Sequence, residues 1–235
     1  MREKAISIRG LKKNYSTGAV DVQALRGIDM DVWRGEFVCI AGKSGSGKST
    51  LLNLVAGLES PSEGSIEVLG RRIDSMNETE RIRFRRSNIG FVFQSYRLLP
   101  QYTAIENIAL PLMLRGIDKH EREKRAMEAL EMVGIAKCAH QRPAQMSGGE
   151  QQRAGIARSI ITEPAIVMAD EPTGNLDPKN SIEIMKLLEE INRRGTTVVV
   201  VTHNREIVNA MKKRVVRLRK GVIISDEKEG VYVED

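Results

Sequence analysis

One short segment carries the residue types and the spacing of a phosphate-binding loop. Residues 42–49 read Gly-Lys-Ser-Gly-Ser-Gly-Lys-Ser and match the pattern G-x-x-x-x-G-K-[ST] without a mismatch. The apolar run at residues 37–40 is typical of a buried strand, and residues 51–55 are typical of a helix face. A strand, a glycine-rich turn and a helix N-terminus together direct backbone N–H groups at one small volume, which favours an anion. We therefore expect a nucleotide polyphosphate here, with Lys48 at its terminal phosphates and the Ser49 hydroxyl on Mg²⁺.

Two further segments end in polar side chains of the kind that act on a phosphate. Residues 165–171 form an apolar run that ends in Asp170 and Glu171. A valine-rich run at residues 196–201 leads to His203. Strands of a parallel sheet deliver their carboxyl ends to one edge, so Asp170 is expected to hold Mg²⁺ through water and Glu171, on the other side of the strand, to polarise an attacking water. His203 is expected to contact the γ-phosphate, and a purely structural histidine is the alternative.

A second glycine-rich turn precedes another helical pattern. Ser147, Gly148, Gly149 and Glu150 open the predicted helix at residues 151–161. Ser147 with a glutamate three positions later is a plain capping box. The same helix N-terminus, with its two glycines, is also suited to a phosphate laid against it. Both interpretations share one geometry, and the spacing by itself does not separate them.

The elements that position these residues follow from the hydrophobic pattern. Short apolar strands separated by helical patterns predict an α/β sheet with a parallel core. The predicted strands are residues 5–11, 37–40, 89–93, 165–169, 196–201 and 215–218. The first of them, together with residues 65–69, resembles an antiparallel β layer instead. Residues 94–163 contain no strand pattern, and residues 119–133 have helical spacing, so we expect one domain (1–235) with a core at 1–93 and 164–235 and a helical insertion at 94–163.

Composition excludes several classes of protein. The 235 residues are 41% hydrophobic and 29% charged, which is ordinary for a globular chain. The net charge of +6 suits an acidic partner, either nucleic acid or an anionic membrane surface, although the basic groups at residues 81–86, 119–125 and 212–220 are also explained as solvated faces. The two cysteines suggest neither disulfide nor metal site, which fits a reducing cytoplasm. No apolar run approaches the roughly 18 residues of a membrane span, and no signal-peptide core follows the N-terminus, so we expect neither a spanning nor a secreted protein.

The set of motifs resembles the ATP-binding-cassette family over essentially the whole chain. The matching segments are residues 42–49 (Walker A), Gln94 (Q-loop), residues 146–152 (signature), residues 166–171 (Walker B), residues 174–177 (D-loop) and His203 (switch histidine). The resemblance implies a P-loop NTPase with a RecA-like, mostly parallel sheet, an antiparallel β layer and an inserted α-helical subdomain. It also implies ATP hydrolysis with Mg²⁺ as cofactor.

The resemblance further implies a head-to-tail homodimer with composite sites. Ser147 and Gly149 of one copy would meet the γ-phosphate that Lys48 of the other copy holds, and Tyr15 would stack on adenine. The positions that match the family's nucleotide contacts are Tyr15, Gly42, Lys43, Ser44, Gly45, Ser46, Gly47, Lys48, Ser49, Thr50, Gln94, Ser147, Gly148, Gly149 and Asp177. The metal positions are Ser49, Gln94 and Asp170, and the catalytic positions are Glu171 and His203. Two positions depart from the commonest pattern: Lys43 replaces a proline and Glu150 replaces a glutamine.

Within the family the chain resembles one group of ATPases. Residues 91–94 and 110–112 are similar to those of macrolide exporters and lipoprotein-releasing transporters, and residues 202–208 to the cell-division ATPase of the same group. This implies a cytoplasmic subunit, peripheral on the inner face of the cell membrane, that drives a separate transmembrane permease. A groove near residues 94–107 would receive a permease helix. Its apolar candidates, which are equally explained as packing residues, are Tyr96, Leu98, Leu99 and Tyr102.

A soluble ATPase that acts on nucleic acid is the competing hypothesis, suggested by the basic balance of the chain. Relatives of that kind usually carry two cassettes or a long coiled-coil insertion, and this chain has neither. The permease-linked interpretation is therefore preferred, and nucleic acid is not expected as a partner.

Overall fold

A six-stranded sheet forms the centre of the computed structural model, which describes residues 3–16 and 21–232. Its strands, in spatial order, are β10 (Val222–Glu227), β9 (Arg214–Arg219), β3 (Phe37–Ala41), β8 (Thr197–Thr202), β7 (Ile166–Asp170) and β6 (Ile89–Phe93). All neighbours pair in parallel except the hairpin β9–β10. Every residue of β3 and β8 is buried, as expected for parallel strands that are covered on both faces. The predicted α/β class with a mostly parallel core is confirmed.

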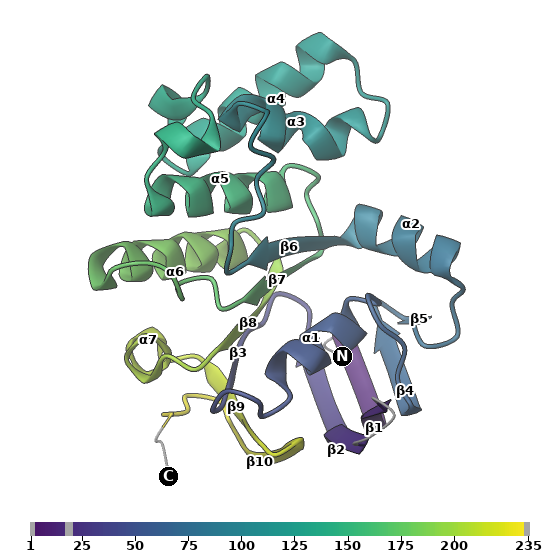
Figure 1. Cartoon of the computed structure of the whole chain (residues 1–235). Coiled ribbons are helices and arrows are strands. Elements are labelled where there is room, and N and C mark those ends of the chain that lie inside the picture. The colour runs from purple at the N-terminus through teal and green to yellow at the C-terminus, as the bar shows by residue number, and fades with distance from the viewer. Residues whose placement is uncertain (1–2, 17–20, 233–235) are drawn as a thin grey trace.

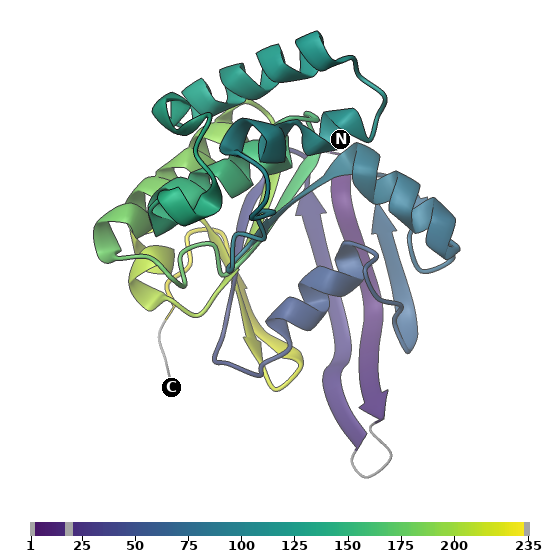
Figure 2. The ribbon, with the colours of Figure 1, turned by 45° about the horizontal axis from the view of Figure 1, so that its top comes forward.

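A second, antiparallel sheet packs beside the first. Its order is β2 (Asp21–Trp33), β1 (Lys4–Ser16), β4 (Glu63–Val68) and β5 (Arg71–Arg72). Helix α1 (Lys48–Val55) lies between the two sheets, and its leucines share one core with both of them (Figure 2). The predicted antiparallel layer is therefore present, and it provides the surface against which the first helix is held.

Helices cover the opposite face of the six-stranded sheet and extend away from it. Helix α6 (Pro178–Arg193) and helix α7 (Arg205–Met211) pack on the sheet. Helix α3 (Ala104–Met113), helix α4 (Lys119–Met132), two short 3₁₀ turns (Ala136–Cys138 and Pro143–Gln145) and helix α5 (Gly148–Ile160) form the layer above them (Figure 1). These elements all fall within the predicted helical insertion. None of the helices in the described ranges is long and apolar enough to cross a bilayer.

Several elements were not named by the sequence prediction, and three of them show why. Strand β2 carries register shifts against β1, so its buried residues do not alternate regularly and no strand pattern emerges. Helix α2 (Glu78–Asn88) buries only Phe84 fully, so it lacks a broad apolar face that periodicity would detect. Strand β10 is an exposed edge strand. Each missed element is held by tertiary contacts rather than by a strong local pattern.

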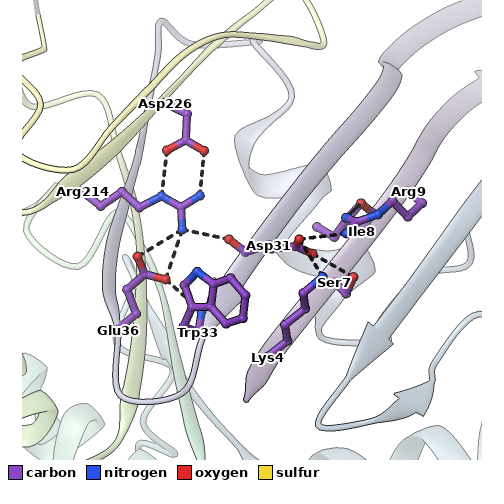
Figure 3. A network of polar contacts seen from close by, with 9 residues as sticks. All are labelled: Lys4, Ser7, Ile8, Arg9, Asp31, Trp33, Glu36, Arg214 and Asp226. Carbon is purple, nitrogen blue, oxygen red and sulfur yellow. Dashed lines mark hydrogen bonds and ion pairs between the residues drawn. The ribbon is translucent and has the colours of Figure 1, made fainter. Parts of the chain in front are cut away.

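A polar network joins the two sheets (Figure 3). The Arg214 guanidinium on β9 contacts the carboxylates of Asp226 and Glu36 and donates to the backbone carbonyl of Asp31, at distances between 2.6 and 3.1 Å. On β1, the guanidinium of Arg9 contacts the Asp31 carboxylate at 2.8 Å and holds the pKa of that carboxyl well below its usual range. Bidentate arginine contacts of this kind fix the orientation of one sheet relative to the other.

Candidate functional site

Four neighbouring parallel strands deliver polar residues to one edge of the sheet. The phosphate loop follows β3, Gln94 follows β6, Glu171 follows β7 and His203 follows β8 (Figure 1). They surround a cavity of about 720 Å³, which is within the usual range of ligand pockets. Its lining residues are Val22, Gln23, Ala24, Arg26, Ser44, Gly45, Gly47, Lys48, Ser49, Thr50, Gln94, Glu171, His203 and Lys220. The predicted convergence of motifs on one site is therefore present in the fold.

The phosphate loop is held in shape by its own side chain and by close backbone contacts. The Lys48 ammonium donates to the carbonyls of Gly42 and Lys43 at 2.8 and 3.1 Å, and its desolvation lowers its pKa. Gly47 adopts a left-handed backbone with φ of 103°, and a Cβ at that position would lie 2.6 Å from the carbonyl oxygen of Ala24. A Cβ on Gly42 would overlap the carbonyl oxygen of Leu218. Only glycine fits at these two positions.

Helix α1 begins with no side-chain cap. Its N-cap residue is Gly47, which has no side chain to accept from the first backbone N–H groups. The first backbone N–H groups of helix α1 therefore have no side-chain acceptor at the helix N-terminus, which adjoins the cavity. Together with the helix dipole they make this end of the helix suited to a phosphate.

The other loop residues lie on the opposite side of the same turn. Gly42, Lys43 and Ser46 line a neighbouring cavity of about 360 Å³, and Ser44 and Gly45 line both cavities. The loop is thus a thin wall with the larger cavity on one side. Of the loop positions predicted to bind nucleotide, Ser44, Gly45, Gly47, Lys48, Ser49 and Thr50 face the larger cavity.

Asp170 lies against the start of helix α1. Its Oδ1 accepts a hydrogen bond from the Ser49 hydroxyl at 3.0 Å, and burial raises the pKa of its carboxyl group. A carboxylate and a hydroxyl are oxygen donors of the type that Mg²⁺ prefers. No cluster of three or more His, Cys, Asp and Glu side chains suited to a metal occurs in residues 3–16 and 21–232. The pair of oxygen donors, Ser49 and Asp170, is of the kind that Mg²⁺ uses, because Mg²⁺ commonly takes one or two protein ligands and completes its shell with phosphate oxygens and water.

Glu171 and His203 form a contact across the sheet edge. The Oε1 atom of Glu171 lies 2.7 Å from Nδ1 of His203. Strand β7 ends at Asp170, so Glu171 lies directly beyond the strand, and its carboxylate contacts a different neighbour from that of Asp170. Glu171 adopts a left-handed backbone with φ of 47°, and its N–H donates to the Val201 carbonyl at 2.9 Å. Backbone strain of this type is typical of functional positions.

Tyr15 lies on β1, outside the set of residues that line the larger cavity. Its hydroxyl donates to Glu59 at 2.6 Å, and the ammonium of Lys13 lies 4.9 Å from the centre of its ring. Burial, followed by the hydrogen bond to Glu59, raises the pKa of this phenol. Stacking of Tyr15 on adenine remains a prediction.

The structure adds lining residues that the motifs did not indicate. Val22, Gln23, Ala24 and Arg26 come from β2, and Lys220 comes from the β9–β10 turn. That turn is held to the phosphate loop, because the N–H of Gly221 donates to the carbonyl of Ser46 at 3.0 Å. The dipeptide Lys220-Gly221 was the only local signal of a turn there, and nothing in the sequence pairs it with the loop.

The second glycine-rich turn lies apart from this cavity. Ser147, Gly148, Gly149 and Asp177 are not among its lining residues. Ser147 caps helix α5, because its hydroxyl accepts from the N–H of Glu150 and its own N–H donates to the Glu150 carboxylate at 3.0 Å. The hydrogen bonds from Ser147, backbone first, lower the pKa of Glu150 to about 2. The capping box is therefore formed within the single chain.

The turn before helix α6 lies next to this second turn. Asp177 caps α6 and accepts from the N–H of Asn180 at 3.0 Å. A Cβ built on Gly149 would lie 2.8 Å from the side-chain oxygen of Asn180. The start of helix α5 in the predicted signature thus lies next to the start of helix α6, which follows the predicted D-loop.

Comparison with known proteins places the chain in a family. The family model described as ABC transporter matches residues 25–174. The cell division ATP-binding protein FtsE of Bacillus subtilis is 48% identical over 227 residues, which are 97% of this chain and 98% of that protein. The macrolide export ATP-binding/permease protein MacB of Bdellovibrio bacteriovorus is 47% identical over 223 residues, which are 95% of this chain and 34% of that protein. The chain belongs to the ABC transporter family.

The solved structures agree with this assignment. A dimeric post-hydrolysis state of an ATP-binding cassette bound to ADP and Pi superposes with a TM-score of 0.89, at 38% identity, and covers 97% of this chain and 100% of that one. The predicted resemblance to the cell-division and macrolide-export group is confirmed. The chain is accordingly an ATP-binding subunit of the transporter type and an ATPase.

Proposed function

We propose that the chain works as a head-to-tail homodimer in which each ATP is held between the phosphate loop of one copy and the signature turn of the other. The observation that supports this is the separation of the two turns: the large cavity contains Lys48, Glu171 and His203 but none of residues 147–150. A single subunit therefore offers one side of a site. A second copy, related by a twofold axis, supplies the other side to each of two sites.

Within one site, the residues divide the work. Lys48 leaves its loop carbonyls to contact the β- and γ-phosphates. Glu171 accepts a proton from the attacking water, and His203, held by its contact to Glu171, orients the γ-phosphate. The signature serine and Gly149 of the second copy, with Asp177 beside them, complete the enclosure of the γ-phosphate. Tyr15 supports the adenine ring.

We propose Mg²⁺ as the metal, because the two side chains that meet here are oxygen donors. The Ser49 hydroxyl and the Asp170 carboxylate, which contact each other at 3.0 Å, would hold it together with the side chain of Gln94. Bound there, the ion would offset the negative charge of the phosphates during cleavage. Gln94 also approaches Gly174, so that it touches the segment that leads to Asp177.

The partner that receives the motion is proposed to be a separate transmembrane permease of the exporter or cell-division type, with the subunit peripheral on the inner face of the cell membrane. A groove of about 330 Å³ lies between β6 and helices α3 and α5. Its floor is apolar, with Phe91, Phe93, Leu110, Pro111 and Leu114 among its lining residues, and it suits one face of a docked helix. It joins the proposed core (1–93 and 164–235) to the proposed helical insertion (94–163), so that a rotation of one against the other would move the docked helix.

The four side chains that the sequence indicated for a groove near residues 94–107 do not line this one. Tyr96, Leu98, Leu99 and Tyr102 are absent from its lining. Leu98 packs against the core of the helical layer, which supports the packing interpretation for that residue. The side chain of Asn107 holds this loop, because it accepts from the N–H of Leu99 and donates to three nearby carbonyls.

The variant Glu171→Gln tests the proposal. Loss of a general base lowers turnover by about 10²- to 10⁴-fold, and a site closed on uncleaved ATP should keep two copies together. We expect a dimer with ATP and a monomer with ADP, measured by light scattering coupled to size exclusion. Glu190→Gln, at a half-buried carboxylate on α6 away from the site, is the control and should behave as the unaltered chain. A Glu171→Gln monomer that hydrolyses ATP at the original rate would remove both the assigned base and the dimer.

A further inference from the structure

The C-terminal end of helix α2 and the residues just after helix α3 are joined by hydrogen bonds and form one outer surface. The guanidinium of Arg115 donates to the Arg86 carbonyl at 2.6 Å, and the guanidinium of Arg86 reaches the Leu114 carbonyl at 3.5 Å. We call this surface the α2–α3 face. Its exposed residues are Ile82, Arg83, Arg86, Met113, Leu114 and Arg115.

The positive charge of the α2–α3 face is not balanced within the chain. Among the residues that the structure describes, Arg83, Arg86 and Arg115 take part in no ion pair, and the side chain of Arg83 makes no hydrogen bond either. The acidic residues of α2 lie in its first turn, where Glu80 is engaged in the capping box with Asn77. By contrast, the exposed Arg193 on α6 is paired with Glu189 and Glu190.

Exposed aliphatic side chains lie among these arginines. Ile82 is 39% exposed, Met113 44% and Leu114 58%, and they are among the few large apolar side chains at the surface of the described residues. Guanidinium groups bind phosphate oxygens in a bidentate manner, and neighbouring apolar side chains favour insertion at the boundary between headgroups and acyl chains. Nucleic acid would also satisfy the arginines, but this face offers it no exposed aromatic ring on which a base could stack.

We propose that the α2–α3 face binds the phosphate headgroups of anionic phospholipids directly. The inference extends the proposed function, because the face continues from the permease groove, which Arg86 and Leu114 also line. A subunit with a permease helix in that groove would hold Arg83 and Arg115 at the level of the headgroups. The contact would orient the cassette on the membrane independently of the permease.

The test uses the full chain and vesicles that contain no permease. Binding is measured by co-sedimentation with phosphatidylglycerol-containing vesicles and with vesicles of phosphatidylcholine alone. We expect binding to the anionic vesicles only, weakened about fivefold by Arg83→Gln, since each basic residue near such a surface contributes that factor. Leu114→Ser should weaken it further, and Arg193→Gln on α6 is the matched control and should leave it unchanged. Arg83 belongs neither to the nucleotide site nor to the permease groove, so ATP hydrolysis should persist in Arg83→Gln.

Several outcomes would overturn the proposal. Equal binding to neutral and anionic vesicles would contradict it. Vesicle binding that is unchanged in both Arg83→Gln and Leu114→Ser would also contradict it. Soluble glycerol 3-phosphate can be added as a competitor of vesicle binding. If it displaces the chain as effectively as added free anionic vesicles do, the arginines bind a free phosphate instead of a membrane. Tighter binding of single-stranded DNA or of polyglutamate, lost in Arg83→Gln, would assign the face to nucleic acid or to an acidic protein. Each of these leaves the ATP-dependent dimer of Glu171→Gln untouched, so failure here is distinguishable from failure of the proposed function.

Discussion

Helices α1 and α5 both begin at a turn rich in serine and glycine, but their first turns are satisfied in opposite ways. Helix α1 has Gly47 as its N-cap and no side-chain cap, and a large cavity lies at its end. Helix α5 begins at Ser147 with a complete capping box to Glu150, whose carboxylate is also held by the ammonium of Lys137 at 3.1 Å. One end is open to a ligand, and the other is closed by its own chain.

The difference assigns the two turns different parts in binding. Uncapped N–H groups are ready for a phosphate and lose only water when it arrives. A capped turn must give up or share internal hydrogen bonds before it contacts an anion, which reduces its intrinsic affinity. We infer that the open turn binds nucleotide in the single subunit. We further infer that the closed turn engages only when a second copy presents a phosphate already held in place.

The largest expected effect comes from Lys48→Ala in the open turn. Hydrogen bonds to charged groups contribute about 1.5–3 kcal/mol each, so ATP affinity of the monomer should fall about 10- to 150-fold. Calorimetric titration of ATP measures this. Lys137→Ala beside the closed turn is the matched control, and its ATP affinity as a monomer should equal that of the unaltered chain. Unchanged ATP affinity in Lys48→Ala would contradict the distinction between the turns.

Replacing one glycine of each turn by alanine should change the free energy of unfolding by different amounts. In Gly42→Ala the new Cβ overlaps the backbone carbonyl of Leu218, and the backbone must move, which lowers the free energy of unfolding by about 1–3 kcal/mol. In Gly149→Ala the Cβ meets only the side-chain end of Asn180, which can rotate, and alanine favours the helix. Denaturant unfolding should therefore separate the two variants clearly. Equal destabilisation would show that the signature turn is packed as tightly as the phosphate loop.

Local patterns predicted the parts of the site that lie on strand ends. The buried apolar runs predicted the strands of the central sheet. The polar residues at their ends, such as Asp170 and His203, were placed at the sheet edge because the carboxyl ends of parallel strands share that edge. The left-handed backbone of Glu171 was not predictable from local pattern, because its N–H donates to the carbonyl of Val201 on the neighbouring strand β8.

The walls of the site that come from other elements had no local signal. Lys220 and the β2 residues reach the cavity only because the hairpin turn at Gly221 is bonded to Ser46. In the closed turn, the capping box and the phosphate-binding interpretation shared one geometry in the sequence. The structure shows that the box is formed within the single chain.

Ser147→Ala sharpens the comparison at the closed turn. Loss of an N-cap lowers the free energy of unfolding by about 0.5–2 kcal/mol, and the same loss is expected from Thr103→Ala, which opens the matching capping box of helix α3. Only Ser147→Ala should also abolish the ATP-dependent dimer, scored by light scattering in the Glu171→Gln background. ATP affinity of the monomer should be unaltered in both. If Thr103→Ala lost the dimer equally, the effect would belong to stability alone.

The smallest expected effect on stability belongs to Glu150→Gln. The folded-state pKa of Glu150 is lowered to about 2 from an ordinary value of 4.5. Its ionised form therefore stabilises the fold fully above pH 4.5, and that stabilisation is lost as the pH falls towards 2. An acid in the first turn of a helix contributes about 0.3–1 kcal/mol. The difference in unfolding free energy between the unaltered chain and Glu150→Gln should shrink over this interval, and a constant difference would show that charge is not its source.

The same substitution should act on the dimer in the opposite direction. Glu150 stays ionised at neutral pH in the first turn of α5, where the γ-phosphate of the other copy is expected to lie, so like charges oppose closure. Glutamine can still accept the cap hydrogen bond from Ser147 but carries no charge, and the ATP-dependent dimer of Glu171→Gln should tighten about two- to fivefold, the scale of exposed charge interactions. Glu106→Gln in the capping box of α3 should leave the dimer unchanged. A weaker dimer in Glu150→Gln would mean that the Lys137–Glu150 pair belongs to the contact between the two copies. The capping box would then form part of the interface, and its hydrogen bonds would not have to open for the dimer to form.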